Sequence, residues 1–404
     1  MTILIVNVGS TSLKFKVFKF PEETILASGR LEKIGRTECP ITLVGRSGKK
    51  RESTANLPDY GAAIDTIIAD LLSPEEGILN YLEELAAVGF KTVHAGPLSL
   101  GEGAKFLTLD VLQAMEDFSF VAMAHNPPYL KAIRTFTDKL PGIPMVGLFE
   151  PAFHATMPPK AYTYSVPFEW QAKAGIRVYG FHGASHRSVW EQTVRLLNIP
   201  PREQDKFRVV SCHLGGSSSL CGIRGGRSMD TTMGYSPQTG LPHNNRCETI
   251  DPFAVLHMMQ RKGWGVEKMA EVLTTECGLK GISGLSGDVG ELNDQTADNG
   301  RARLALAVFH YHVAKQAVAM GVACGGIDAI AFAGGIGERG VPNRWAICQE
   351  LAGMVQVFLD KAKNEACVSK EGIISTHDSP VKVVVVMTNE ELVVAREVHA
   401  LLNR

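Results

Sequence analysis

The chain has 404 residues, and its 41 lysines and arginines against 42 aspartates and glutamates give a formal net charge of −1. A balanced charge without a long basic run argues against a nucleic-acid-binding surface. The longest apolar run, residues 381–387, has the size of a strand and is too short to span a membrane. A chain of this length with 45% hydrophobic residues is expected to form two globular domains.

The eight cysteines are scattered and form no CxxC pair. This spacing indicates reduced, mostly buried thiols and not a disulfide framework or a zinc site. The N-terminus enters a strand-like segment directly, without the pattern of a signal peptide. We therefore expect a cytoplasmic protein.

The first predicted element is a strand–turn–strand unit in "ILIVNVGSTSLKFKVF", residues 3–18. An apolar run at residues 3–6 is followed by a small polar loop at 7–12. Apolar residues and lysines then alternate over 13–18, which predicts a half-buried strand and not a helix. The loop is therefore expected to join two strands of a hairpin.

This first loop has the chemistry of a phosphate site. A tight turn exposes backbone N–H groups, and its hydroxyls and the nearby Lys14 add further donors and positive charge. Gly9 allows close approach of the backbone. Taken alone, a Gly/Ser turn is usually only a turn. The side chains that could surround a phosphate here are Ser10, Thr11, Ser12 and Lys14.

Further along the chain, "AAVGFKTVHAG" (86–96) and "GIPMVGLFE" (142–150) have the pattern of buried strands. The turn-forming residues after Glu150 predict a domain boundary there. We expect an N-terminal domain of residues 1–150, completed by a returning C-terminal helix at about 388–404, and a second domain of residues 151–387.

The second half of the chain repeats the opening pattern at residues 207–223, "FRVVSCHLGGSSSLCGI". Its Gly/Ser loop, 215–219, corresponds to the first loop, and Gly225-Gly226 predicts a hairpin turn. Two serine-lined turns, one in each domain, could grip a polyphosphate from both sides. The repeat predicts two similar α/β domains.

The last third of the chain alternates between helix and strand. A helix is expected at 301–323, a strand ending in a glycine-rich turn at 327–340, and a strand, a Thr-Asn cap and an amphipathic helix at 381–402. The glycine-rich turn could take the nucleoside part of a nucleotide.

At this point the motifs identify a resemblance that covers nearly the whole chain. They are "NVGSTSLK" (7–14), "AHNPP" (124–128), "AFHATMP" (152–158), "YGFHGASHR" (179–187), "CHLGG" (212–216), "SMDTTMGYSPQTGL" (228–241), "GISGLSGD" (281–288), "GGIGE" (334–338) and "TNEE" (388–391). The chain resembles the acetate kinase family, within the wider superfamily of sugar kinases, actin and heat-shock chaperones. The resemblance implies an α/β fold of two actin-like (ribonuclease H-like) domains with a cleft between them, and a homodimer.

The resemblance also implies an activity and its cofactors. It is the reversible transfer of the γ-phosphoryl group of ATP to a short-chain carboxylate, acetate or propionate, which gives an acyl phosphate and ADP. Such a transfer needs in-line positioning and positive charge around the phosphoryl group, with Mg²⁺ bridging the phosphates.

Site residues follow from the resemblance, position by position. Those with implied catalytic roles are Lys91, Glu150, His182 and Arg246. In the first loop the implied phosphate contacts are Asn7, Ser10, Ser12 and Lys14. The other implied nucleotide and phosphate contacts are His213, Gly215, Gly216, Asp288, Gly335, Ile336, Gly337 and Glu338. The implied acid pocket comprises Val93, Ala124, His125, Phe181 and Pro237, and the metal-linked residues are Asn7 and Glu390.

The chain also departs from the family pattern. Lys91 replaces an arginine and lacks its planar fork, and Glu150 replaces an aspartate. Gly216 replaces an asparagine. Gly290 replaces the arginine that packs on adenine, which predicts loose base selectivity. Ala124 replaces a leucine and is expected to enlarge the acid pocket.

Two alternatives to a carboxylate kinase remain open from the residues. One is a related phosphotransferase with another acceptor or another donor, such as pyrophosphate. The other is a nucleotide-binding regulator without catalysis, since such a protein would also lose site residues. A serine hydrolase is excluded because the chain has no G-x-S-x-G element.

Overall fold

The computed structural model describes residues 1–76, 78–101 and 103–404. Internal contacts divide the chain into two compact units. Unit 1 comprises Met1–Ala152 and Asn389–Arg404, and unit 2 comprises Phe153–Thr388. Each unit is built around one mixed β-sheet.

The strands of unit 1 are β1 (Thr2–Gly9), β2 (Ser12–Lys19), β3 (Thr24–Glu32), β4 (Arg36–Val44), β5 (Lys50–Leu57), β6 (Leu85–Thr92), β7 (Lys105–Phe106) and β8 (Met145–Phe149). Its helices are α1 (Tyr60–Leu71), η1 (Leu82–Glu84), α2 (Leu109–Asp117), α3 (Asn126–Lys139) and α16 (Glu390–Leu402), and η2 (Glu150–Thr156) follows β8.

The predicted first hairpin is present, but its loop is shorter than expected. β1 and β2 pair without interruption from Thr2–Lys19 to Gly9–Ser12, so only Ser10 and Thr11 form the turn. Asn7 was predicted to lie in the loop, but it lies in β1 opposite Lys14. The ladder continues because each backbone group in this stretch finds a partner on the facing strand.

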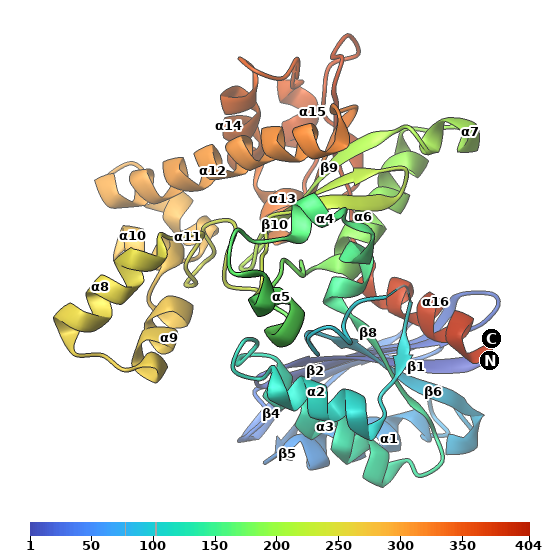
Figure 1. The fold of residues 1–404 in the computed structure, drawn as a ribbon. Coiled ribbons are helices and arrows are strands. Elements are labelled where there is room, and N and C mark those ends of the chain that lie inside the picture. The colour runs from blue at the N-terminus through green and yellow to red at the C-terminus, as the bar shows by residue number, and fades with distance from the viewer. Residues whose placement is uncertain (77, 102) are drawn as a thin grey trace. The chain divides into compact units, whose positions relative to one another are not determined.

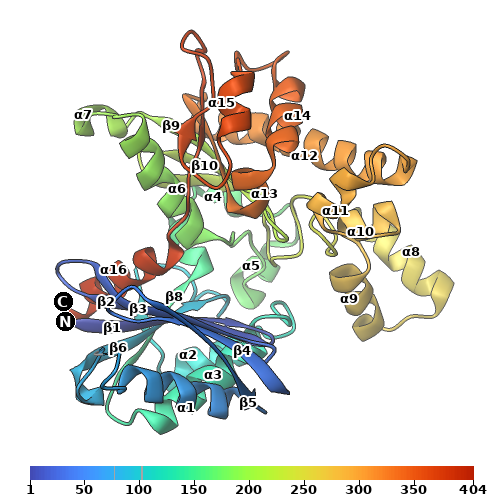
Figure 2. The ribbon, with the colours of Figure 1, turned by 180° about the vertical axis from the view of Figure 1, so that it is seen from behind.

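Helices cover both faces of the unit 1 sheet (Figures 1 and 2). A Cβ atom added to Gly89 would meet Ile5 and Val398, whereas the ring of the next residue, Phe90, packs on Phe136. Since successive strand residues point to opposite faces, α16 lies on one face of β6 and α3 on the other. Buried residues on both faces explain why the central strands are continuously apolar.

The strands of unit 2 are β9 (Arg208–His213), β10 (Ser219–Arg224), β11 (Arg227–Thr231), β12 (Ala329–Ala333), β13 (Gly372–Ile373) and β14 (Lys382–Val385). Its helices are α4 (Pro159–Tyr162), α5 (Phe168–Ala174), α6 (Gly183–Leu196), α7 (Pro201–Gln204), α8 (Pro252–Lys262), α9 (Val266–Thr275), α10 (Gly278–Ser283), α11 (Val289–Asp294), α12 (Gly300–Cys324), α13 (Gly334–Arg339), α14 (Val341–Leu351) and α15 (Lys361–Ala366).

The two sheets share one arrangement of their central strands. In unit 1 the order is β3-β2-β1-β6-β8, and in unit 2 it is β11-β10-β9-β12-β14. In both, an antiparallel hairpin continues into two parallel strands. The prediction of an α/β fold with two actin-like domains is confirmed, and the sequence repeat at 207–223 corresponds to β9 and β10.

The unit 2 sheet is also covered on both faces. Val209 of β9 packs in one hydrophobic cluster with Val189 of α6, whereas Val210 packs in another with Val313 of α12. Strands β12 and β14, which continue the sheet beyond β9, divide their residues between the two clusters in the same alternating way. At the predicted hairpin turn, Gly225 and Gly226 have φ angles of 58° and 75°, which glycine adopts at little cost.

Helix length and hydropathy bear on membrane insertion. Within the described part of the chain, no helix combines the length and the apolar character that a bilayer crossing requires.

Candidate active site

The first group of predicted site residues lies on the β1–β2 hairpin of unit 1. Asn7 faces Lys14 across the ladder, and Gly9 faces Ser12. Because directly paired residues and their i+2 neighbours point to one face, Asn7, Ser12 and Lys14 share a face of the hairpin. Ser10 is exposed in the turn.

Close packing explains why residue 9, at the start of this turn, is a glycine. A Cβ atom added there would lie 2.6 Å from Ser12 Oγ, closer than side-chain atoms approach. Tyr60 donates a hydrogen bond from its hydroxyl to the Gly9 carbonyl. The turn is thus fixed from behind by α1, and its outer side carries the hydroxyls.

Tyr129 of α3 orients Asn7. Its hydroxyl accepts a hydrogen bond from Val8 N–H at 3.1 Å and donates one to Asn7 Oδ1 at 3.1 Å. Since Oδ1 is held on the tyrosine, Nδ2 is directed away from it as a donor. Tyr129 was not among the predicted residues.

Lys91 lies between two acids in the same unit. Its ammonium is 2.9 Å from Glu150 Oε1 and 2.6 Å from Glu390 Oε2. The exposed fractions of the three side chains are 18%, 5% and 16%, respectively. We call Lys91, Glu150 and Glu390 the acid triad. With one positive and two negative charges, it carries a net charge of −1.

Burial and charge act on Lys91 in opposite directions. Burial alone would lower its pKa, but Glu150 and then Glu390 outweigh that penalty and hold the pKa well above its ordinary value. Lys91 therefore stays charged, and its first role in the fold is to neutralise the acids.

The predicted acid-pocket residues are divided between the two units. In unit 1, Val93 is buried, Ala124 is exposed and His125 precedes α3. In unit 2, Phe181 and Pro237 are buried.

The predicted catalytic histidine, His182, begins a hydrogen-bonded chain in unit 2. Its Nδ1 lies 2.8 Å from Ser219 Oγ, which lies 2.9 Å from His186 Nε2. His186 Nδ1 in turn lies 2.8 Å from Ser211 Oγ. His182 has a φ of 58°, an uncommon conformation for a residue with a side chain.

Ser219 couples the two histidines. Its hydroxyl has one hydrogen, so it donates to one ring nitrogen and accepts from the other. If Ser219 donates to His182 Nδ1, then His182 carries its hydrogen on Nε2, and His186 donates from Nε2. Ser219 and His186 thus decide which nitrogen of His182 acts as a donor.

Replacing Ser219 by alanine is expected to lower kcat by about 10-fold, because an oriented hydrogen bond of this kind contributes roughly 1–2 kcal/mol. The unfolding temperature should fall only slightly. The matched control is Ser228→Ala, since the Ser228 hydroxyl bonds His154 at 2.8 Å and lies outside the chain from Ser219 to Ser211. Equal losses of kcat in the two variants would refute a special role for Ser219.

His213 lies beside this chain. Its ring centroid is 4.2 Å from that of His182, and its Nδ1 lies 2.6 Å from Ser185 Oγ. The structure therefore brings His182 and His213 together.

The expectation that the second serine-lined turn faces a phosphate is wrong for two of its serines. Ser218 and Ser219 are fully buried. Ser218 Oγ bonds the backbone of Gly215, and Ser219 Oγ bonds the histidines. Both hydroxyls therefore stabilise the protein interior around the turn. The exposed backbone of the turn is at Gly216.

A second loop is fastened to this turn. Ser218 N–H donates to His243 Nδ1 at 3.1 Å, and Asn244 N–H donates to Gly216 O at 3.1 Å. Burial lowers the pKa of His243 to about 3, so its Nδ1 stays an acceptor. The loop that carries Arg246 is thereby held in place.

Arg246 is partly buried in this loop. Its Nη1 donates to the Pro237 carbonyl at 2.9 Å. Burial lowers the pKa of Arg246 to about 10. No carboxylate of the described residues pairs with it, so the guanidinium lacks a compensating negative charge.

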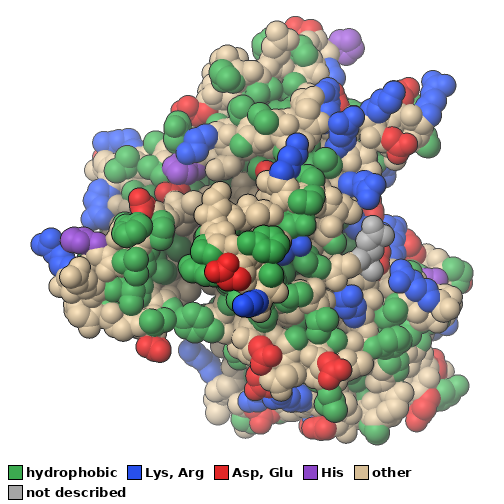
Figure 3. All heavy atoms as spheres, in the orientation of Figure 1, with side chains coloured by type: hydrophobic (Ala, Val, Ile, Leu, Met, Phe, Trp, Pro, Cys, Tyr) green, Lys and Arg blue, Asp and Glu red, His purple; other side chains and the backbone are tan. Residues whose placement is uncertain are grey.

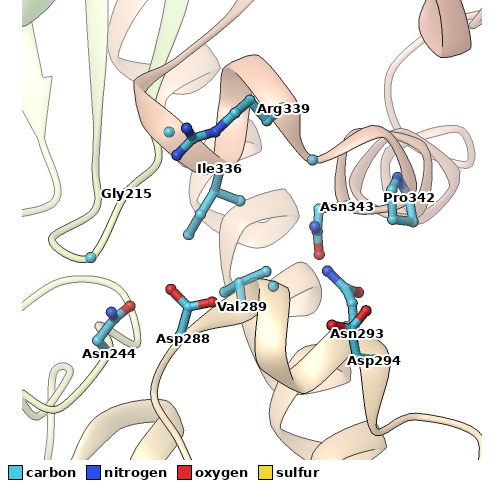
Figure 4. Close-up of a pocket in the computed structure, with 14 residues that line it drawn as sticks. Gly215, Asn244, Asp288, Val289, Asn293, Asp294, Ile336, Arg339, Pro342 and Asn343 are labelled. Atoms are coloured by element: carbon cyan, nitrogen blue, oxygen red, sulfur yellow. The ribbon is translucent and has the colours of Figure 1, made fainter. Parts of the chain in front are cut away.

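A cavity of about 400 Å³ lies in unit 2 between the glycine turn, α11, α13 and α14 (Figure 4). It is within the size range of small-molecule sites. The predicted residues that line it are Gly215, Gly216, Asp288, Gly335 and Ile336. Gly337 is buried in α13, and His213 and Glu338 also do not line the cavity.

The glycine-rich segment after β12 is the short helix α13 and not the turn that was predicted. Gly334 enters it with a φ of 74°, and a Cβ atom there would lie 2.6 Å from the Leu214 carbonyl. Arg344, fully buried, donates to the Gly337 carbonyl at 2.8 Å and holds α13 from behind. These contacts place Ile336 at the cavity.

Sequence reasoning missed several lining residues. They are Asn244, Val289, Asn293, Asp294, Arg339, Gly340, Pro342 and Asn343, while Gly290 was noted only as a departure from the family pattern. Isolated asparagines on helix surfaces have no pattern that distinguishes them. Only the approach of α11 to α14 brings them to one cavity.

The buried histidines of unit 2 predict acid sensitivity. Burial lowers the pKa of His154 to about 4, that of His243 to about 3, and that of His186 well below its ordinary value. In the unfolded chain each has a pKa of about 6.5. Their contribution to stability is therefore complete above about pH 6.5 and is lost as the pH falls.

Between pH 7 and pH 5 the free energy of unfolding should fall by about 2 kcal/mol for each such histidine. Thermal unfolding followed at several pH values checks this. In His154→Gln the free energy of unfolding should depend less steeply on pH, because unfolding takes up about one proton fewer. An unfolding temperature that stays constant over this range would contradict the prediction.

Comparison with known proteins gives the family. Residues 2–396 match the acetokinase family. The chain is 39% identical to the acetate kinase of Halothermothrix orenii over 398 residues, which are 98% of each chain. It is 39% identical to the acetate kinase of Geobacillus kaustophilus over 402 residues, which are 99% of each chain.

Solved structures agree with these relatives. Acetate kinase of Porphyromonas gingivalis matches with a TM-score of 0.86 and 32% identity over 99% of both chains. A propionate kinase from Francisella tularensis matches with a TM-score of 0.87 and 31% identity over 98% of both chains. The chain belongs to the acetokinase family.

Proposed function

We propose that this protein transfers the γ-phosphoryl group of ATP reversibly to acetate, and also to propionate. The observation that carries the proposal is Arg246. This partly buried guanidinium, which no described carboxylate pairs, lies in a chain of the acetokinase family. A desolvated cation of this kind favours an anionic ligand, and the guanidinium fork suits a carboxylate or a phosphoryl group.

The chemistry requires little proton transfer. A carboxylate oxygen of the acid attacks the γ-phosphorus, a new P–O bond forms, and the bond to the β-phosphate oxygen of ADP breaks with its electron pair going to ADP. The acid is already ionised at neutral pH, so no general base is needed. Catalysis then depends on positioning and on positive charge.

The residues of the two units are assigned to this reaction as follows. Arg246 and His182 stabilise the oxygens of the transferring group, with His182 donating from Nε2. Lys14 and the donors of the first turn bind phosphate. The cavity beside α13 takes the nucleoside. We propose that the unit 1 and unit 2 residues act in one reaction.

Magnesium fits the residues of unit 1. Glu150 and Glu390 supply hard oxygen donors around a net negative charge. The described residues contain no cluster of three His, Cys, Asp or Glu side chains that could hold a metal ion. Mg²⁺ commonly takes one or two carboxylates together with substrate phosphates, and two carboxylates are available here. When bound, the ion would neutralise charge on the phosphates.

The homodimer remains part of the proposal. Helix α8 has no buried residue, and Phe253 and Leu256 on it are 76% and 55% exposed. Hydrophobic side chains gather over this part of the surface in Figure 3. Such a patch marks an interaction surface, and we assign it to a second copy of the chain. A cytoplasmic location, without nucleic-acid or membrane partners, is likewise proposed.

The test is a panel assay that traps acyl phosphate as hydroxamate. Acetate, propionate and butyrate are offered with ATP, GTP, ITP or pyrophosphate. We expect product from acetate and propionate with ATP, and propionate within tenfold of acetate in kcat/KM because Ala124 leaves room for a further CH₂ worth up to ~0.8 kcal/mol. Product only with pyrophosphate would support the related phosphotransferase. Nucleotide binding without any product would support the regulator.

A further inference from the structure

Asn343 of α14 is the most unusual polar residue of the unit 2 cavity. It is 1% exposed, yet it lines the cavity. Its Oδ1 lies 2.8 Å from His310 Nε2. Its Nδ2 is buried and has no hydrogen-bond partner among the described residues. Leaving such a donor unsatisfied is costly, so a buried donor of this kind is expected to have a partner.

His310 of α12 fixes which way this amide points. The Asn343 oxygen can only accept, so His310 donates from Nε2. Burial lowers the pKa of His310, so the ring is neutral at physiological pH, and the contact with Asn343 Oδ1 places its one hydrogen on Nε2. The amide is therefore held with its oxygen on His310 and its nitrogen as the remaining donor.

The surroundings of the nitrogen are those of a ligand site. Gly340 lines the cavity, and a Cβ atom added to it would lie 2.8 Å from Asn343 Nδ2. A side chain at Gly340 would therefore collide with this nitrogen. Figure 4 shows that Asn343 extends toward Asn293, which projects from α11 on the facing wall.

Apolar side chains also line the cavity, beside polar ones that include Asp294. Val289, Ile336 and Pro342 line it, and such flat apolar walls suit the faces of an aromatic ring. The glycine turn at Gly215 and Gly216 lies at the other end of the lining. A nucleotide with its phosphates toward the turn would place its base near Asn343.

We propose that Asn343 reads the base of the bound nucleotide by donating a hydrogen bond from Nδ2 to a ring nitrogen of a purine, with His310 as the positioning residue behind it. This inference rests on the proposed nucleotide-dependent function. It makes Asn343 a specificity-determining residue. A base without an acceptor nitrogen at that place leaves the buried donor unsatisfied and binds more weakly.

The experiment is an equilibrium binding titration of the full-length protein with Mg·ATP and with its 1-deaza, 3-deaza and 7-deaza analogues, each of which lacks one ring nitrogen. One of the three analogues should bind about 10-fold more weakly than ATP, and the other two should bind as ATP does. Because the wild-type protein is used, this result does not depend on the folding of a variant.

Variants then assign the effect to Asn343. In Asn343→Leu, which keeps the branch at Cγ but cannot form a hydrogen bond, ATP should bind about 10-fold more weakly and the discrimination between ATP and the sensitive analogue should disappear. The matched control is Asn244→Leu, at the turn end of the same cavity. It should keep the discrimination whatever its affinity for ATP.

A second pair of variants tests His310. Gln can still donate a hydrogen bond to Asn343 Oδ1, whereas leucine cannot. His310→Gln should therefore keep the discrimination, and His310→Leu should weaken it. A merely structural histidine would lower the unfolding temperature in both without changing the preference between analogues.

The outcomes separate this inference from the proposed function. If all three analogues bind the wild-type protein as ATP does, or if Asn343→Leu keeps the preference, the inference is overturned while kinase activity stands. If the discrimination is found but no acyl phosphate forms, the inference stands and the proposed function fails.

Discussion

Replacement of Arg246 by alanine is expected to lower kcat for acyl phosphate formation by about 10³-fold, since removing one positioned charge at a transferring phosphoryl group has effects of this size. The unfolding temperature should not fall, because the wild-type guanidinium is desolvated, with its pKa lowered to about 10, and lacks an acidic partner among the described residues. The hydroxamate assay and thermal unfolding give the two measurements.

The Arg246→Lys variant separates the effect of the positive charge from the effect of the guanidinium geometry. Lysine keeps a positive charge but loses the planar fork, so its activity should lie between those of wild type and Arg246→Ala. A loss of less than 10-fold in Arg246→Ala would contradict the assignment of Arg246 to the reacting groups. In that case the anion would have to be held elsewhere.

The second large effect is expected at the acid triad. Lys91→Met leaves Glu150 and Glu390 partly buried without their ammonium, and breaking a buried pair in this way costs roughly 3–5 kcal/mol. Urea unfolding should show this loss at pH 7. The loss should shrink toward pH 5, because the two carboxylates, once their pKa values rise, can take up protons there.

Two further variants test the cause. Lys91→Arg keeps the charge and should retain most of the stability. Lys91→Met combined with Glu150→Gln removes one of the two uncompensated negative charges and should recover part of the loss. If the double variant is no more stable than Lys91→Met, charge repulsion within the triad is not the cause.

Much of the fold could be predicted because buried parallel strands leave a strong local signal. Val209 and Val210 face opposite hydrophobic clusters, so the strand must be apolar at every position, and this can be read in the chain itself. The first hairpin and the C-terminal helix have similarly local patterns. The family motifs marked His182 and Arg246 in the same way.

The rest of the site depends on contacts between distant residues. Lys91 and Glu390 are 299 positions apart, and no local pattern shows that one neutralises the other. From the sequence alone, Ser219 could equally have faced a phosphate. It points inward because His182 and His186, at the start of α6 and within it, both bond its hydroxyl. The partnership of His310 with Asn343 arises only where α12 and α14 meet.

Helix α16 belongs to unit 1, although the chain reaches it only after all of unit 2. Its Val394 and Val398 pack against β6, and Glu390 at its start completes the acid triad. While the nascent chain is incomplete, the first sheet has one uncovered face and Lys91 lacks one of its two acids. Premature termination a few codons before Asn389 would therefore give a product with an exposed apolar sheet, a form prone to aggregate.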